Sequence, residues 1–441
     1  MEHFASVLRP RGQRPGADLT LTSPGEAEKA RRFHSGLPGY APTPLVSLDG
    51  LAHSLGVSKI WIKDESKRFG LNAFKALGGS YAMARCLSEK LGKPLEEMSF
   101  EELCAPAARR ALGDITFVTA TDGNHGRGVA WAARLLGQKA VVYMPKGSAA
   151  ERLENIRAQG AQAEITEYNY DDAVRLANRM AEEHGWILIQ DTAWPGYEEI
   201  PAHIMQGYTT LAAETLQQLE EQGAERPTHL FLQAGVGSFA GAALGFFTSV
   251  WGEERPVTAI VEPDRADCLF RTAQADDGAL HFVTGDMDSM MAGLCCGEPC
   301  TISWKIIDAY ADAFLSCGDG YAARGMRLLA RPEEGDPAVG QAIAMGRKAY
   351  QMIQDAMAAL TAEDELAARK VIAADDAVDF DFNAIKHTLA QEIAADPAKV
   401  DAALDLLMVI KYLERIGDHA VNVAEWVQFV RTGRYKDESM F

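Results

Sequence analysis

Short apolar runs alternate with amphipathic stretches along this chain as far as about residue 337. The runs predict buried strands at 59–64, 115–120, 140–144, 187–191, 229–233 and 257–262. Helical patterns such as 129–136 and 151–159 lie between them, and glycines mark the turns from strand to helix. Because parallel strands buried on both faces are apolar throughout, whereas the helices that cover them are amphipathic, this alternation predicts an α/β fold with a mainly parallel sheet.

The pattern changes after Asp336. Only four glycines and two prolines follow, and the segment predicts three long helices near 339–360, 363–394 and 398–431. Thr361 and Asp396 are candidate N-caps, with Pro397 at a first helical position. Small and apolar residues recur at spacings of three and four along the last helix, at Leu406, Ile410, Leu413, Gly417, Ala420, Ala424 and Val427. This stripe is typical of a bundle seam, so residues 338–441 are expected to form a three-helix bundle joined almost without a linker.

Charge and cysteine content narrow the class of protein. The net charge of −19 argues against nucleic acid or an anionic membrane surface as the main partner. No run of 18 apolar residues predicts a membrane span, and residues 1–15 lack the apolar core of a secretory signal. We therefore expect a cytoplasmic protein. Cys295, Cys296 and Cys300 are close in sequence, and we interpret them as ordinary reduced thiols in preference to metal ligands.

A lysine beside an aromatic residue is the first candidate for chemistry. Phe74 and Lys75 come shortly before Gly78-Gly79-Ser80. An imine-forming lysine needs a fixed position and a depressed pKa, and small residues after it allow a cofactor ring to approach. An ordinary surface lysine is the alternative interpretation.

A glycine-rich turn follows the strand predicted at 115–120. Asp122 precedes Gly123, and Asn124 and His125 lie between Gly123 and Gly126. A turn of this kind between a strand and a helix is a common ligand-binding corner of α/β proteins. Asn124 offers a neutral donor, and Asp122 is a candidate base or ammonium anchor. The alternative is a tight turn in which the aspartate caps a helix.

Two further strand ends carry candidate site residues. Gly235, Val236, Gly237, Ser238, Phe239 and Ala240 follow the strand predicted at 229–233. Successive backbone N–H groups in such a loop can hold a phosphate at a helix N-terminus, although the spacing matches a dinucleotide fingerprint only loosely. Asp191 ends the strand predicted at 187–191, where a parallel sheet gathers its active-site groups, or else it is a turn aspartate.

Taken together, these motifs resemble the fold-type-II pyridoxal-phosphate (PLP) enzymes. The order Phe74-Lys75, then Gly123-Asn124-His125-Gly126, then Gly235-Val236-Gly237-Ser238 carries the resemblance over roughly residues 15–337. Within that group, the motifs around Lys75, Asp122 and Asp191, together with Met291-Ala292-Gly293-Leu294, look like those of the 2,3-diaminopropionate ammonia-lyases. The resemblance implies two parallel-sheet subdomains, the smaller at roughly 80–190, and a homodimer that acts on a small amino acid.

The resemblance also implies a role for each site residue. Lys75 would be covalently linked to PLP and would remove the Cα proton of one substrate enantiomer, and Asp122 that of the other. Asp191 would keep the leaving β-amino group protonated. Asn124 would bond the ring hydroxyl, Phe74 would contact the cofactor, and residues 235–240 would hold its phosphate. Elimination would yield aminoacrylate, which hydrolyses to pyruvate with release of two ammonia molecules in all.

The tail resembles a different family, the PhoU-type regulators of phosphate transport. The run from Leu413 to Glu425 and the acidic run 375–379 carry this resemblance. Glu414 and Asp418 lie four residues apart, as do Asp375 and Asp379, so each pair shares one helix face. Facing carboxylates from two helices can bind metal ions, and a solvated acidic face is the alternative.

The junction leaves two functions open. Near residue 337 the lyase family continues into a segment that contacts the pyridine nitrogen, whereas this chain enters the bundle. The first interpretation is a PLP-dependent lyase, truncated at the end of domain 1–337, that releases pyruvate and ammonia. The alternative is a catalytically impaired PLP fold whose metal-binding bundle serves as a phosphate-signalling interaction module.

Overall fold

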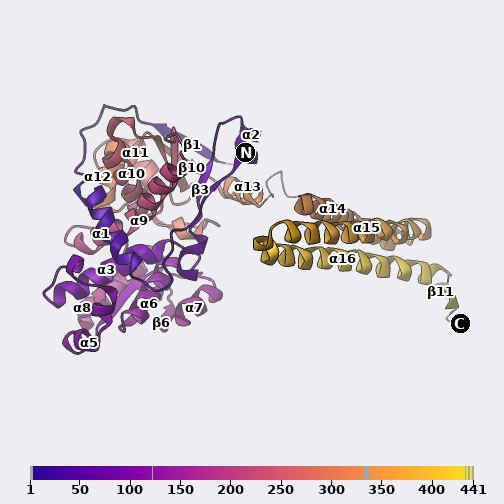
Figure 1. Ribbon diagram of the computed structural model, residues 1–441, viewed down its shortest axis with the longest axis horizontal. Helices are drawn as coiled ribbons and strands as arrows, with labels where there is room; N and C mark the ends of the chain where they lie inside the picture. Colours follow the sequence, from indigo (N-terminus) through magenta and orange to yellow (C-terminus); the bar gives the residue numbers. More distant parts are fainter. Residues whose placement is uncertain (1–2, 122, 331–336, 433, 436–437, 440–441) are drawn as a thin grey trace. The chain divides into compact units, whose positions relative to one another are not determined.

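The computed structural model describes residues 3–441 apart from 122, 331–336, 433, 436–437 and 440–441 (Figure 1). The chain divides into two compact units, of which the first combines Met1–Ser47 with Trp61–Met326 and the second combines Leu48–Ile60 with Arg327–Phe441. Within the described residues, no helix is both long and apolar enough to cross a membrane.

Two four-stranded sheets build the first unit. One has the order β1-β10-β9-β8, formed by Phe4–Leu8, Ala313–Cys317, Val257–Pro263 and His229–Gln233, and only β1 runs antiparallel to its neighbour. The other has the order β6-β5-β4-β7, formed by Gln162–Ile165, Lys139–Met144, Thr116–Ala120 and Ile187–Leu188, and it is parallel throughout. The α/β class expected from the alternating pattern is confirmed.

Helices cover both sheets (Figure 1). In the first unit they are α1 Pro24–Ser35, α3 Lys75–Lys90, α4 Phe100–Cys104, α5 Pro106–Leu112, α6 Asn124–Leu135, α7 Ala150–Arg157, α8 Tyr170–His184, α9 Glu199–Glu221, α10 Ser238–Trp251, α11 Cys268–Ala275 and α12 Thr301–Tyr310. Helix α13, Asp319–Leu329, follows β10. Short 3-10 helices occur at Thr20–Thr22, Glu65–Gly70, Leu95–Glu97, Gly252–Glu254 and Ala292–Leu294.

Helices α3 and α9 pack against each other in the core of the first unit through two glycines. A Cβ atom at Gly78 would lie 2.6 Å from side-chain atoms of both Ile204 and Tyr208, and one at Gly207 would lie 2.5 Å from the Leu77 carbonyl oxygen. Only glycine permits backbones to approach this closely without displacement. The contact fixes α3, whose first residue is Lys75.

Two strand predictions need correction. The run 59–64 forms only the short strand β3, Trp61–Lys63. It pairs antiparallel with β2, Leu45–Ser47, and this pair belongs to neither main sheet. Helix α2, Asp49–Leu55, lies between the two strands in sequence. The run 187–191 is a strand only at Ile187–Leu188. The backbone N–H of Gln190 donates to the Tyr197 hydroxyl, and the backbone carbonyl of Asp191 accepts from Ser238 Oγ, so these groups bond to side chains instead of a neighbouring strand. Strands β1, β6 and β10 were not predicted. Strands β1 and β6 are largely solvent-exposed and lack a continuous apolar run, whereas β10 is buried and has Ser316 within its five residues.

Three long helices form the core of the second unit: α14 Pro337–Ala362, α15 Glu365–Ala395 and α16 Val400–Thr432. The predicted seam is confirmed, since Ile410, Gly417, Ala420, Ala424 and Val427 are buried and Leu406 and Leu413 pack against them. The cap prediction at Thr361 is wrong: this residue lies inside α14, and Asp364 caps α15 by accepting from the N–H groups of Leu366 and Ala367.

The remaining elements of this unit are short. Asp396 follows the end of α15, and Pro397–Lys399 forms a 3-10 turn before α16. Two-residue strands β11, Arg434–Tyr435, and β12, Glu438–Ser439, pair with each other near the end of the chain.

Candidate active site

A cavity of about 980 Å³ lies where several parallel strands end. Its walls come from the residues after β4, β5, β6, β7 and β8, together with residues 72–75 and the loop 286–296. In parallel α/β sheets, ligands bind outside the carboxyl ends of the strands, because the loops that diverge there leave a crevice. The predicted residues Phe74, Lys75, Asn124, Asp191, Gly235, Val236, Gly237, Ser238, Phe239 and Ala240 all line this cavity.

Lys75 and Asp191 form an ion pair within the cavity. The Lys75 Nζ atom donates to Asp191 Oδ2, and it also lies 5.7 Å from the ring centres of Phe74 and Tyr208. The depressed pKa expected for Lys75 is not found: burial by itself would lower it, but the negative charge of Asp191 raises it above the ordinary value. Burial opposes ionisation of Asp191 as well, yet the Lys75 and His125 charges bring the pKa of this carboxyl down to about 2. The pair is therefore an ammonium beside a carboxylate across the ordinary pH range.

Three side chains that were not singled out as site residues hold Asp191 in place. His125 Nε2 donates to the Ile189 carbonyl at 2.8 Å, which directs Nδ1 toward Asp191 Oδ2 at 3.9 Å. The Tyr170 hydroxyl donates to Asp191 Oδ1 at 3.5 Å and accepts from Gln190 Nε2 at 2.9 Å. His125 lies within a motif quoted above, but Tyr170 comes from the start of α8, and nothing in its local sequence points to the site.

The start of α10 faces the same cavity. Gly237 has a φ of +100° and precedes this 14-residue helix, whose first turn contains Ser238, Phe239 and Ala240. The first N–H groups of a helix have no acceptor within the helix and carry partial positive charge, so they suit a phosphate. Ser238 Oγ donates to the Asp191 carbonyl oxygen, which ties this loop to the strand end that bears the carboxylate.

The cavity therefore offers the two features that a PLP molecule requires. The partly buried Lys75 amine can bond to its aldehyde, and the first N–H groups of α10 at a glycine turn can hold its phosphate. The residues present fit the cofactor. Asp122, the remaining catalytic candidate, lies outside the described residues.

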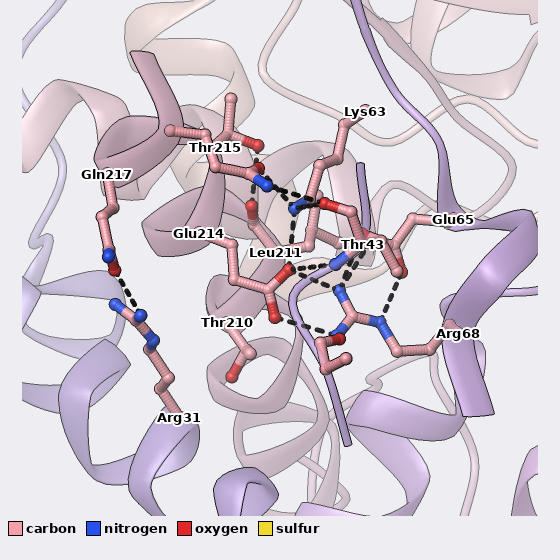
Figure 2. Close-up of polar contacts among 12 residues, drawn as sticks. Arg31, Thr43, Lys63, Glu65, Arg68, Thr210, Leu211, Glu214, Thr215 and Gln217 are labelled. Atoms are coloured by element: carbon pink, nitrogen blue, oxygen red, sulfur yellow. Dashed lines mark hydrogen bonds and ion pairs between the residues drawn. The ribbon is translucent and has the colours of Figure 1, made fainter. Parts of the chain in front are cut away.

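A buried ion-pair network supports the chain just before Lys75 (Figure 2). The Arg68 guanidinium donates to both carboxylate oxygens of Glu214, at 2.8 and 2.7 Å, and to those of Glu65 at 2.9 and 2.7 Å. Lys63 Nζ lies 2.7 Å from Glu214 Oε2. Glu214 is 1% exposed, and the two cations bring its pKa down to about 2 although burial by itself would raise it.

This network reaches the edge of the cavity. Glu65 both lines the cavity and accepts from Arg68, and the backbone after Arg68 is left-handed at Phe69, Gly70 and Asn72. Non-glycine residues with positive φ persist where the surrounding structure holds them in place. We therefore regard Arg68 and Glu214 as positioning residues for the segment that leads to Lys75.

The four carboxylates predicted to bind metal lie in the helical unit. Asp375 is close enough to Asp379, Asp418 and Glu414 for their charges, after burial, to raise its pKa to about 6. Lys411 Nζ pairs with Glu414 Oε1 at 2.7 Å. Among the described residues, no three of these four carboxylates bring ligand atoms within 4.8 Å of one another. They therefore share a neighbourhood without forming a compact ligand set.

A family described as pyridoxal-phosphate dependent enzymes matches residues 37–345, and the chain belongs to this family. It is 56% identical over 320 residues to a diaminopropionate ammonia-lyase of Salmonella typhimurium, a match that covers 73% of this chain and 79% of that protein. A diaminopropionate ammonia-lyase of Escherichia coli is 52% identical over 334 residues, covering 75% of this chain and 82% of the relative.

Solved structures agree with this assignment. The holo diaminopropionate ammonia-lyase of Escherichia coli superposes with a TM-score of 0.70 at 50% identity, covering 76% of this chain and 82% of that one. The same enzyme in complex with an aminoacrylate-PLP azomethine reaction intermediate gives 0.69 at 48% identity, with the same coverage. A second family, the PhoU domain, matches residues 343–427. The chain thus joins a PLP-dependent lyase fold to a helical region similar to PhoU.

Proposed function

We propose that this chain catalyses the PLP-dependent α,β-elimination of 2,3-diaminopropionate, giving pyruvate and two molecules of ammonia. The proposal depends on one observation: the Lys75–Asp191 ion pair and the start of α10, whose N–H groups suit a phosphate, line the same cavity. The assay of purified full-length chain for pyruvate and ammonia release from diaminopropionate tests it. Absence of pyruvate from a preparation that contains bound cofactor would favour the catalytically impaired alternative.

The roles of the site residues follow from their chemistry. Bound PLP withdraws electrons from Cα and so acidifies its proton. The Lys75 amine would hold the cofactor and would take the Cα proton of one enantiomer. We propose that Asp122 takes the proton of the other. Asn124 would donate to the ring hydroxyl, with Phe74 beside the lysine.

Asp191 is assigned to the leaving group. An amine leaves carbon readily only as ammonia from a protonated ammonium, and a neighbouring carboxylate stabilises that charge. Asp191 pairs with the Lys75 ammonium, whose charge holds the pKa of this carboxyl at about 2 while the two are paired, and the β-ammonium of the substrate would supply the same kind of charge. The same oxygen can therefore accept from the β-ammonium of the substrate when Lys75 is engaged elsewhere.

Replacement of Asp191 by asparagine is expected to lower kcat for diaminopropionate by about a hundredfold or more, because the neutral amide no longer favours the ammonium. β-Chloroalanine should be affected much less, since chloride leaves without a proton. Steady-state kinetics with both substrates measure this difference. If kcat falls equally with the two substrates, Asp191 does not act on the leaving group and only positions other groups of the site.

The division of the chain and its assembly are also proposals. We place the lyase domain at 1–337, with a smaller subdomain near 80–190, and the PhoU-like bundle at 338–441. The matches to the two families, at 37–345 and 343–427, support a junction in this region. Kinship with amino-acid lyases supports a cytoplasmic homodimer.

For the bundle, we propose a metal site formed by Asp375, Asp379, Glu414 and Asp418, serving a phosphate-signalling interaction. Burial first, and then the repulsion of neighbouring carboxylates, raise the pKa of Asp375, and a bound cation would relieve that repulsion, which supports the proposal. Gly417 matters here, because a Cβ at this position would lie 3.0 Å from Asp375 Oδ1.

Asp375→Asn is expected to stabilise the metal-free bundle at pH 7.5. The folded-state pKa is about 6, above the ordinary 3.8, so protonated Asp375 contributes stability below pH 3.8 that is lost as the pH rises through 6. The gain at pH 7.5 should be below about 1 kcal/mol, because solvent screens this partly exposed group. It should disappear near pH 4.

Amide hydrogen exchange in α15 and α16, measured with a chelator present, detects this change. Asp405→Asn provides the control, because Asp405 is an exposed aspartate of α16. Faster exchange in the Asp375→Asn variant at pH 7.5 would contradict the repulsion on which the metal proposal depends.

A further inference from the structure

Three potential metal ligands lie together in the first unit and do not belong to the cavity. One carboxylate oxygen of Glu89, one of Glu199 and one ring nitrogen of His203 lie within 4.8 Å of one another. None of these residues lines the cavity that contains Lys75. The proposed lyase reaction therefore leaves them without a role.

Two packed helices supply the three side chains. Glu89 stands in the last turn of α3, while Glu199 and His203 stand in the first two turns of α9, four residues apart. Side chains at this spacing share one helix face, so both point toward the same partner. Glu199 lies in the first turn of α9, where the positive end of the helix dipole stabilises a carboxylate. The dipole does not explain the presence of a histidine at position 203.

His203 is the informative member of the group. It is 7% exposed, and its Nδ1 atom is buried with no hydrogen-bond partner among the described residues. A buried polar atom left unpaired is uncommon and costly, and a bound water or ion is a usual explanation. Burial, helped by the Arg85 charge, lowers the pKa of His203 to about 4, so the ring is neutral and can donate a lone pair to a metal.

The neighbouring charges leave the two carboxylates available. Arg85 Nη1 lies 3.2 Å from Glu96 Oε1, whereas its Nη2 atom is 3.7 Å from Glu89 Oε1, a long contact. The Glu89 side chain is 48% exposed, and Glu199 is exposed. Both can rotate toward an ion at modest cost.

We infer that Glu89, Glu199 and His203 bind a divalent ion of the Zn²⁺ type and thereby tie the end of α3 to the start of α9. One imidazole with two carboxylates is a ligand set that Zn²⁺ accepts, and the fourth tetrahedral position is left for water. Because α3 begins at Lys75, the ion would stiffen the helix pair that carries the catalytic lysine.

The test uses full-length chain with bound cofactor, stripped of metal by a chelator and titrated with Zn²⁺, and separately with Co²⁺ as a spectroscopic probe. The wild-type chain should bind one more Zn²⁺ ion than His203→Ala, and should show visible Co²⁺ absorption bands that this variant lacks. Glu199→Gln should weaken binding at this site at least about tenfold. Zn²⁺ should raise the Tm of the wild type more than that of either variant.

Two controls separate this site from others. Glu183→Gln removes an exposed carboxylate of α8 and should bind like the wild type. Asp418→Ala should lose any ion held by the bundle but retain this one. If circular dichroism shows that His203→Ala does not fold, the Glu199→Gln variant still tests the site, because Glu199 is exposed and its replacement should not disturb folding. Equal Zn²⁺ binding and Co²⁺ spectra in the wild type and the folded variants would overturn the proposal.

Discussion

Lys75→Ala is expected to reduce pyruvate release from diaminopropionate by at least about a thousandfold, because one amine serves both cofactor attachment and proton transfer. The absorbance band of lysine-bound cofactor should disappear at the same time. In this variant Asp191 loses the charge that chiefly opposes its burial, so its pKa should rise from about 2.

The absorbance spectrum and a coupled pyruvate assay measure these changes. Lys67→Ala is the matched control for activity, since Lys67 is an exposed lysine eight residues before Lys75 in the chain. Lys146 also lines the cavity, so retention of the band in Lys146→Ala would show that attachment depends on the position of the amine. Persistence of the band in Lys75→Ala would refute the assignment of Lys75.

Glu214→Ala is expected to give the largest loss of folding stability, about 3–5 kcal/mol. The substitution leaves Arg68, which is 1% exposed, and the largely buried Lys63 without their common carboxylate. Removing one partner of a buried pair costs more than the pair contributes, because the remaining charge stays desolvated. The loosened segment 65–72 should also weaken cofactor binding, since Glu65 lines the cavity.

Urea unfolding of the first unit measures this loss. Glu220→Ala is the control, because Glu220 is an exposed residue of the same helix; its free energy of unfolding should stay within about 0.5 kcal/mol of the wild-type value. The pH dependence has a definite sign. The pKa of Glu214 falls from 4.5 to about 2 on folding, so its stabilisation is fully present above pH 4.5 and is lost as the pH falls through 2. A Glu214→Ala chain as stable as the control would show that this network carries little of the stability.

Local sequence was enough to predict the strands and turns that build the site. Strands β4, β5, β8 and β9 are built mainly from apolar residues, and glycine-containing turns follow β4 and β8. The burial of β4, β5 and β9 follows from composition over a few residues, and the turns after strands are local features too, which is why Lys75, Asp191 and Gly237 could be named as candidates beforehand. The expected burial of β8 is wrong, since three of its five residues are exposed and Phe231 is 65% exposed. The same holds for the seam of α16, whose spacing of three and four is a local property.

Features that depend on distant partners were not predictable in this way. The Arg68–Glu214 pair joins residues 146 positions apart, and a glutamate within an apolar helix carries no local sign of its partner. The cap of α15 was misplaced by three residues, since both Thr361 and Asp364 suit an N-cap and only the packed length of α14 decides between them. Exposed strands such as β6 are defined by hydrogen bonds to a neighbour.

The sequence by itself determined the class of fold, the lysine and the glycine turns, because hydrophobic periodicity and backbone freedom are properties of short segments. Only the tertiary structure decided that Asp191 meets Lys75, that His125 and Tyr170 hold Asp191, and that Glu89 approaches His203. Each of these contacts joins side chains that are far apart in sequence, and their energies depend on burial, which arises only when the chain has packed.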